Sequence, residues 1–374
     1  MAKNFDTNSA DAQATMVEPC EPEHFDYDAY LDYEESHREK CTRFWQAESG
    51  VLVYRRVRVA EVFAYGSRDM KKSLQWQLGA LKKSMAYQAD IANFLEPWYG
   101  IGTIASAYGA DYYWVTGQAP IVKPIFKNAE QALKYSPMPV DETEIGRIIL
   151  RMIEYFLDQT QGKLPISLTD TQSPLNCAGN IIDISNFMLE TVTQPDDIRE
   201  LLDRIADLSI EFTSKQLDLL GFNTVWPGHG FASSKVFEGI GMSDDNMLML
   251  SGQSYFEIAV PSLEKFAQPF GGPAFHSCGN WSNRIPWVNR IKNLKMVDGA
   301  FSEETDPEPN PAKPFNGFFT KDIVLNARIV GDANTVLQKV AQLWQPGMKL
   351  IVVTYCDTPE EQAMVYNRIH QMCD

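Results

Sequence analysis

One histidine and two cysteines are the residues of this sequence whose types and positions best fit a metal site. His276-Ser-Cys278-Gly follows a short apolar stretch, and Cys356 ends a longer one, residues 350–355. Both stretches are typical of buried parallel strands, whose C-terminal ends gather side chains around a ligand. Side chains two positions apart on a strand share a face, so His276 and Cys278 should point the same way. One imidazole and two thiolates would hold zinc and leave its fourth position for substrate.

Further polar side chains follow other predicted strands. His229 stands between two glycines after residues 224–227, which favours either substrate contact and proton handling or a plain turn. Each metal candidate also has a structural alternative, because a buried cysteine is often only a small hydrophobic residue. Carboxylates at strand ends orient a polar substrate or fix a histidine tautomer. The residues predicted to line the opening where the strands end are Asp170, Gln172, Asp244 and Asp245.

The elements that must position these residues alternate along the chain. A helix is predicted from Pro195, because proline is favourable at the first helical position and a stripe of apolar side chains follows. About eight strands alternating with helices predict an α/β fold, a (β/α)8 TIM barrel whose active site lies where the strands end. The predicted strands are residues 51–57, 90–96, 111–115, 165–170, 224–227, 272–275, 296–300, 323–330 and 350–355.

Composition narrows the classes of partner and compartment. The chain has 374 residues and a net charge of −16, which argues against nucleic acid and against an anionic membrane surface. Six cysteines without framework spacing favour free thiols or metal ligands in a reducing compartment. No apolar stretch approaches the roughly 20 residues of a spanning helix, and the polar first residues predict no signal peptide. We therefore expect a cytoplasmic protein; a homo-oligomer is compatible with the sequence.

Two segments lie outside the repeating pattern. Residues 18–39 hold nine acidic side chains, and this run predicts either a solvated surface helix or a docking arm for a partner. We divide the chain into an acidic extension, 1–48, helical or partly disordered, and a barrel domain, 49–374. The proline-rich segment 303–315 is predicted to be an extended loop, either a lid over the barrel mouth or a passive linker.

Several short motifs resemble those of the uroporphyrinogen decarboxylase superfamily, and in particular its zinc-dependent methyltransferases. The resemblance covers most of the chain from about residue 50. Its motifs are Asp170-Thr-Gln-Ser-Pro-Leu, Thr193-Gln-Pro-Asp-Asp-Ile-Arg-Glu-Leu-Leu-Asp, Ser243-Asp-Asp, Phe256-Glu-Ile-Ala-Val-Pro-Ser-Leu, His276-Ser-Cys-Gly-Asn and Tyr355-Cys-Asp-Thr-Pro-Glu. By position, the resemblance implies that the zinc ligands are His276, Cys278 and Cys356, on a (β/α)8 barrel.

The sequence departs from the decarboxylases of this superfamily in one respect. They carry an arginine-rich motif after the first strand that positions the substrate's carboxylates, and residues 54–68 contain no such motif. Asp90 is similar in position to the aspartate with which the decarboxylases bind pyrrole nitrogens, which would make it a catalytic residue together with His229 and Asp170. A substrate with many carboxylates would also meet an acidic protein. The resemblance therefore favours methyl transfer over decarboxylation.

The predicted chemistry follows from the ligand set. A free thiol with a pKa of about 8.5 is mostly protonated at neutral pH, whereas coordination to zinc deprotonates it. We expect a zinc-dependent enzyme that moves a methyl group between a corrinoid, supplied by a partner protein, and a small thiol activated as zinc thiolate. The alternatives are a decarboxylase acting on a tetrapyrrole or another polycarboxylate, and a non-catalytic barrel that binds a corrinoid.

Overall fold

A parallel sheet of six regular strands forms the centre of the molecule. The computed structural model describes residues 13–317 and 322–373. Hydrogen bonds join the strands in the order β1-β8-β7-β6-β5-β4. The strands are β1 (Gly50–Arg55), β4 (Ile240–Ser243), β5 (Pro273–His276), β6 (Met296–Ala300), β7 (Val324–Arg328) and β8 (Lys349–Thr354). The predicted α/β class with a parallel sheet is confirmed.

The regular strands do not close into the predicted eight-stranded barrel. Three extended segments run instead between the sheet edges β1 and β4, and they are joined by single bridges, Leu95 to Ile166 and Ile166 to Thr224. Backbone bonds continue this series from Asp90 N to Val53 O (2.8 Å) at one edge and from Gly241 N to Pro227 O (2.9 Å) at the other. Strands were predicted at 90–96, 165–170 and 224–227, where the structure has these irregular segments.

The side chain of Asn93 explains why residues 90–96 do not form a regular strand beside β1. Its amide donates to the carbonyl of Arg55 (2.9 Å), and its carbonyl accepts from the backbone N–H of Val57 (2.9 Å). A side-chain amide thus takes the bonds that a ladder would give to backbone groups, and it satisfies buried polar atoms that would otherwise lack partners.

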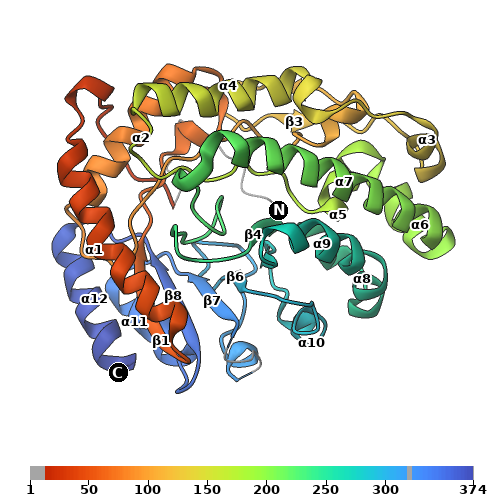
Figure 1. Ribbon diagram of the computed structural model, residues 1–374. Coiled ribbons are helices and arrows are strands. Elements are labelled where there is room, and N and C mark those ends of the chain that lie inside the picture. The colour runs from red at the N-terminus through yellow and green to blue at the C-terminus, as the bar shows by residue number, and fades with distance from the viewer. Residues whose placement is uncertain (1–12, 318–321, 374) are drawn as a thin grey trace.

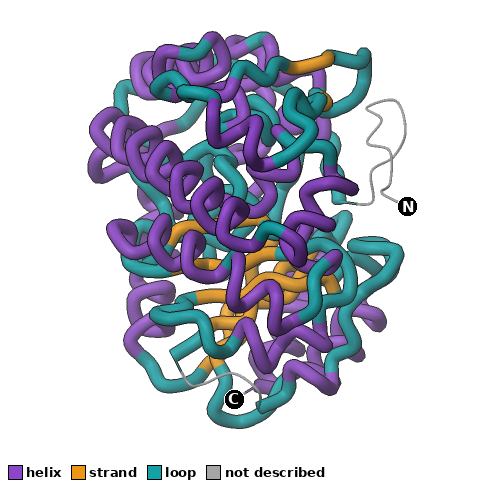
Figure 2. Tube along the Cα trace, turned by 90° about the vertical axis from the view of Figure 1, so that its right-hand side faces the viewer, coloured by secondary structure: helices purple, strands orange, loops and turns teal. Residues whose placement is uncertain are grey.

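The helices lie around the sheet. In Figure 1, α4 to α7 lie together on one side of the molecule, while α11 and α12 lie beside the sheet on the other. Figure 2 shows the strands of the parallel sheet gathered in one half of the molecule. The helices are α1 (Tyr27–Gln46), α2 (Met70–Ser84), α3 (Ala129–Lys134), α4 (Glu144–Gln159), α5 (Pro174–Ile181), α6 (Ile184–Thr193), α7 (Pro195–Leu220), α8 (Gly252–Ile258), α9 (Val260–Ala267), α10 (Ile285–Val288), α11 (Ala333–Leu343) and α12 (Pro359–Cys373).

One predicted strand is placed wrongly, one strand was not predicted, and one predicted helix start is confirmed. Residues 111–115 were predicted to form a strand of the barrel, but Tyr112–Tyr113 (β2) pairs antiparallel with Ile121–Val122 (β3) in a separate two-stranded sheet. The short strand β4 was missed, because two glycines, Gly239 and Gly241, interrupt its apolar pattern. Helix α7 does begin at Pro195, as its first-turn proline predicts.

The acidic extension supplies a helix that packs against the body of the protein. Asp26 caps α1 by accepting from the N–H of Ala29 (3.1 Å). One face of the helix is buried, including Tyr30, His37 and Cys41, while its acidic residues lie mostly on the exposed face. Residues 1–12 of the extension lie outside the described part of the chain. Within the described ranges, no helix is both long and apolar enough to cross a membrane.

Candidate metal centre

A row of polar side chains crosses three neighbouring strands, from the end of β5 to the middle of β6 and β7. The register pairs His276 of β5 with Asp298 of β6, and Asp298 with Asn326 of β7. Paired residues of neighbouring strands project to the same face. Asp298 therefore accepts from Asn326 Nδ2 (2.5 Å) and holds His276 Nδ1 (2.5 Å). Arg328 lies two residues beyond Asn326 and donates its Nε to the same carboxylate (2.9 Å).

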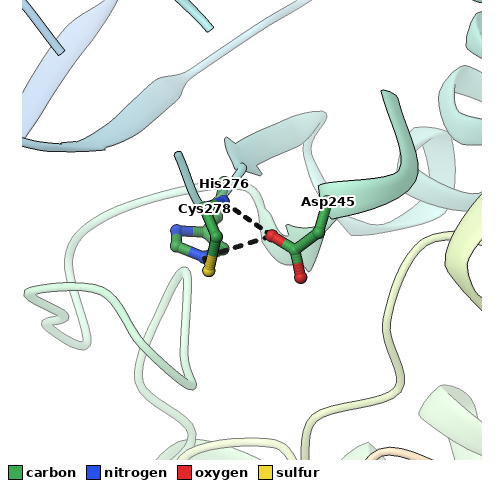
Figure 3. A group of neighbouring side chains, drawn as sticks. All are labelled: Asp245, His276 and Cys278. Atoms are coloured by element: carbon green, nitrogen blue, oxygen red, sulfur yellow. Dashed lines mark hydrogen bonds and ion pairs between the residues drawn. The ribbon is translucent and has the colours of Figure 1, made fainter. Parts of the chain in front are cut away.

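Three potential metal ligands meet at the free edge of the His276 imidazole. The ligand atoms of Asp245, His276 and Cys278 all lie within 4.8 Å of one another (Figure 3). His276 Nε2 is 3.5 Å from Cys278 Sγ and 3.8 Å from Asp245 Oδ1. Two residues of this group were predicted as ligands. They were expected to share a face of one strand, but β5 ends at His276, and Cys278 approaches the imidazole from the bend that follows the strand. The group contains nitrogen, sulfur and oxygen donors, which together fit zinc.

The surroundings prepare His276 for a metal on its Nε2. Since a carboxylate accepts at Nδ1, that nitrogen carries the proton and donates, which fixes the tautomer and ring orientation. Burial lowers the pKa of His276, but Cys278 and Asp298 outweigh this effect and raise the pKa well above its usual value. Burial likewise opposes ionisation of Asp298, yet Arg328 and His276 lower its pKa below the usual range. Asp298 is therefore a charged partner for the imidazole.

The segment 303–315 supports the turn that carries Cys278. Gly279, with φ of +71°, donates its N–H to Asp306 (2.9 Å). Asn310 donates to the carbonyl of Gly279 (3.1 Å) and accepts from the N–H of Trp281 (2.9 Å). The N–H of Cys278 itself donates to Asp245 Oδ1 (2.6 Å). Of the two predicted roles, lid and passive linker, neither describes these contacts, which brace the turn after β5.

Cys356 is not a member of the group. It follows β8, which lies three strands from β5 in the sheet, about 14 Å away at the usual strand spacing. The residue is 2% exposed, and burial raises the pKa of its thiol to about 12. Its carbonyl accepts from Arg55 Nε (2.8 Å). The structure thus brings together two of the three predicted ligands with Asp245, and ligation by Cys356 stays a prediction.

The two neighbouring aspartates at the end of β4 occupy different environments. Asp244 is fully buried and accepts from Ser173 Oγ and Tyr255 Oη, both at 2.8 Å. Burial raises the pKa of Asp244 to about 7 in spite of these bonds. The Asp245 side chain is 42% exposed and faces His276. Both were predicted to bind substrate; Asp244 has no exposed surface for that role, and Asp245 stands among the potential metal ligands.

A second histidine, His229, is also held by a buried carboxylate. His229 Nδ1 lies 2.7 Å from Glu96 Oε2, and Glu96 Oε1 accepts from Arg56 (3.2 Å). Burial opposes ionisation of Glu96, but Arg56 and His229 lower its pKa to about 2. On its other side, His229 Nε2 faces Asp170 Oδ2 at 3.6 Å. The structure therefore brings together His229 and Asp170, which were both predicted to follow strands at the opening of the barrel.

Gln172 has an unusual backbone conformation next to this second histidine. Its φ is +61°, a region that residues other than glycine rarely adopt. This conformation lets both its backbone N–H (3.1 Å) and its side-chain amide (2.7 Å) donate to Asp170. Gln172 was predicted to contact substrate; it contacts Asp170 and fixes the direction of that carboxylate.

Asp90 lies in neither of these clusters. Its carboxylate accepts from Lys40 (3.1 Å), Tyr366 (2.6 Å) and the N–H of Val53 (2.9 Å), and it lies 2.9 Å from His370 Nε2. These partners come from α1, α12 and β1. Both oxygens are occupied, so the geometry is that of an anchor between elements, whereas the sequence predicted a catalytic residue.

Sequence reasoning missed the carboxylates that hold the two histidines. Asp298 interrupts an otherwise apolar strand, Met296 to Ala300, and a buried charge in a strand is rare unless it is paired. That interruption was an available signal. Glu96 precedes a proline at the end of an extended segment, and nothing in its local sequence separates it from an ordinary turn residue.

The comparisons agree with the fold. A structure described as a methyltransferase from Methanosarcina mazei is similar to this chain, with a TM-score of 0.64 and 14% sequence identity over 90% of this chain and 98% of that chain. At this identity the similarity shows the fold. A search of curated proteins found no match. The family description "Uroporphyrinogen decarboxylase (URO-D)" matches residues 37–225, half of the sequence, and the chain belongs to that family.

Proposed function

We propose that this protein is a zinc-dependent methyltransferase that moves a methyl group between a protein-bound corrinoid and a small thiol. The observation that carries the proposal is the group formed by Asp245, His276 and Cys278, in which an imidazole, a thiol and a carboxylate converge. It stands at the C-terminal end of parallel strands, where barrel and open α/β folds bind substrates. The similarity to a solved methyltransferase and the bridged segments between β1 and β4 support a (β/α)8 barrel for this function.

The residues of the group would divide the work as follows. His276, Cys278 and Asp245 would hold zinc and leave its fourth position for the substrate thiol. Cys356, the third ligand expected from the family resemblance, would have to take the place of Asp245 to keep that position open. A bound zinc ion would supply the Lewis acidity that keeps a substrate thiol deprotonated at neutral pH. Asp298 accepts a hydrogen bond from His276 Nδ1 and so directs Nε2 toward Asp245 and Cys278, where a bound metal would take the place of the proton that the raised pKa favours. Cys278 is exposed, and this exposure would make the group accessible to a corrinoid carried by a partner protein.

Metal analysis of purified variants tests the proposal directly. We expect zinc near one equivalent in the parent protein and a loss of most of it in Cys278→Ser, because a neutral hydroxyl replaces a thiolate. Cys20→Ser is the matched control, since Cys20 is buried in a separate place and binds the carbonyl of Glu21. Equal zinc in the parent and in Cys278→Ser would contradict the proposed site. Asp245→Asn and Cys356→Ala then decide which of these two residues is a ligand.

An activity assay separates methyl transfer from the alternatives. Free methylcobalamin and a panel of thiols should give methylated thiol and demethylated corrinoid, and Cys278→Ser should give neither. Decarboxylation is the alternative that the family's description favours. Two arginines near the described sites, Arg56 and Arg328, are already paired with protein carboxylates, which does not favour a polycarboxylate substrate. Decarboxylase activity that survives removal of the metal would overturn the proposal.

A further inference from the structure

Two buried polar atoms have no hydrogen-bond partner among the residues that the structure describes. They are Nη2 of Arg328 and Oη of Tyr355. Arg328 is 8% exposed and Tyr355 is 7% exposed. A buried donor without a protein partner costs stability unless water or a ligand accepts its hydrogen bond. Two such donors that lie side by side indicate a place where an acceptor binds.

The register of the sheet brings these two side chains to the same side. Arg328 of β7 lies opposite Val353 of β8. Tyr355 stands two positions after Val353 and packs in the same cluster of buried side chains. Residues two apart in extended backbone point to the same side, so Tyr355 projects on the side of Arg328, further toward the C-terminal end of the sheet. Arg56 follows β1 at that level, since its N–H donates to the carbonyl of Thr354 (3.2 Å).

The influence of Tyr355 on two arginines agrees with this placement. Burial lowers the pKa of Arg328, but Asp298 and then Tyr355 outweigh this effect and raise it. In the same way, burial lowers the pKa of Arg56, whereas Glu96 and then Tyr355 raise it. The hydroxyl of Tyr355 therefore lies within electrostatic reach of both guanidinium groups.

The two donors fit a carboxylate. A guanidinium group has no acceptor atoms, and Nε of Arg328 is already bonded to Asp298 (2.9 Å), which leaves Nη2 for another acceptor. The hydroxyl of Tyr355 donates one hydrogen bond. A carboxylate offers two oxygens, one for each donor, and its bond to a charged guanidinium is about twice as strong as a bond between neutral groups. A metal cation would be repelled by the guanidinium charge.

The number of donors fits one acid group better than several. Nη2 of Arg56 is bonded to Glu96 (3.2 Å), so this neighbouring arginine is engaged by the protein. A phosphate group offers more acceptor oxygens than the two atoms of Arg328 and Tyr355 can serve. A small molecule with a single carboxylate matches the two donors.

We propose that Arg328 and Tyr355 form a binding site for the carboxylate of a small molecule, at the C-terminal end of the sheet. Nη2 of Arg328 would donate to one oxygen of the ligand, and Oη of Tyr355 would donate to the other. Nε of Arg328 would stay bonded to Asp298, so the site adjoins the carboxylate that holds His276. The inference goes beyond the proposed function and requires no metal.

Binding of simple probes to metal-free protein tests this site apart from any zinc chemistry. Tyrosine labelled with ¹³C at Cζ gives one signal for each of the 15 tyrosines, and Tyr355→Phe identifies the signal of Tyr355 by its absence. Propionate should shift this signal saturably, whereas propanol and propylammonium should not. Tyr108 is the internal control, because its hydroxyl is also buried without a partner but its ring packs against Phe126 and Tyr135. No shift with propionate, an equal shift at Tyr108, or a shift with inorganic phosphate alone would overturn the inference.

Two variants then separate ligand binding from a structural role of the hydroxyl. Calorimetric titration with propionate should show an affinity about 10-fold lower in Tyr355→Phe, as expected for the loss of a hydrogen bond to a charged group. The urea midpoint of this variant should not fall, because the hydroxyl bonds to no described residue. Tyr108→Phe is the matched control and should keep the affinity of the parent protein. A lower urea midpoint in Tyr355→Phe would count against the site, and an unchanged affinity would contradict it; both outcomes leave the proposed zinc chemistry standing.

Discussion

Two histidines of this protein are held by the same arrangement and differ in what lies opposite. His276 and His229 each direct Nδ1 to a buried carboxylate, Asp298 in one case and Glu96 in the other. Each carboxylate is in turn paired with a buried arginine, Arg328 or Arg56. The arginine keeps the carboxylate charged, and the carboxylate fixes the imidazole, so Nε2 is presented in a defined direction in both places.

The difference lies at Nε2. His276 faces a thiol and a carboxylate, whereas His229 faces a carboxylate alone. Nitrogen, sulfur and oxygen together form a ligand set that suits soft or borderline metal ions, whereas His229 and Asp170 face each other as an imidazole and a carboxylate without a third ligand. The same arginine–carboxylate pair thus fixes both imidazoles. The residues opposite Nε2 decide whether the histidine belongs to a potential metal site.

The largest expected effect is on stability, after removal of an arginine. Arg56→Met should lower the free energy of unfolding by about 3–5 kcal/mol, because it leaves the buried charge of Glu96 without its main partner. Arg328→Met should cost less, since Asp298 keeps the donor Asn326. Urea denaturation followed by circular dichroism measures both. Equal losses in the two variants would show that Asn326 does not compensate.

Low pH should weaken the pairing of the Glu96 carboxylate with Arg56 and His229. The pKa of Glu96 is lowered from 4.5 to about 2, so its contribution to stability is fully present above about pH 4.5. That contribution, about 3 kcal/mol, should be lost as the pH falls from 4.5 toward 2. The urea midpoint measured between pH 7 and pH 3 follows the loss. Glu96→Gln should show a flatter profile over this range; an unchanged profile would mean that Glu96 titrates alike in the folded and unfolded states.

Replacing the carboxylate beside each histidine by an amide distinguishes the metal group at His276 from the site of His229. Asp298→Asn should weaken zinc binding about 10–100-fold, because His276 loses the charged partner that fixes its tautomer. Glu96→Gln, the matched change beside His229, should leave zinc affinity within about twofold. Competition with a chromophoric chelator measures both affinities. A comparable loss in Glu96→Gln would mean that His229 contributes to the metal centre.

The sequence predicted the regular half of the molecule better than the irregular half. Strands β5 to β8 were found because each is a nearly continuous apolar run. His276 and Cys278 were paired by the alternation of strand side chains, but Cys278 lies in the bend after β5, so the pair meets for another reason than the predicted one. Residues 90–96 have a similar composition, but the Asn93 side chain replaces the ladder there. Asp245 was predicted to line the opening of the barrel but not to bind metal. Its approach to His276 depends on the pairing of β4 with β5. Such tertiary pairings are not contained in local patterns.

The smallest expected effect concerns Asp90, where a histidine also meets a carboxylate but by its Nε2. His370→Ala should lower the free energy of unfolding by about 1–2 kcal/mol, since one hydrogen bond between α12 and Asp90 is lost while Lys40, Tyr366 and the N–H of Val53 remain. Zinc content and methyl transfer should match the parent protein, because Asp90 and His370 lie outside the group formed by Asp245, His276 and Cys278. Tyr366→Phe removes another donor to the same carboxylate and should give a loss of similar size. Loss of methyl transfer in His370→Ala at normal stability and zinc content would contradict the anchoring role and return Asp90 to the catalytic role that the sequence suggested.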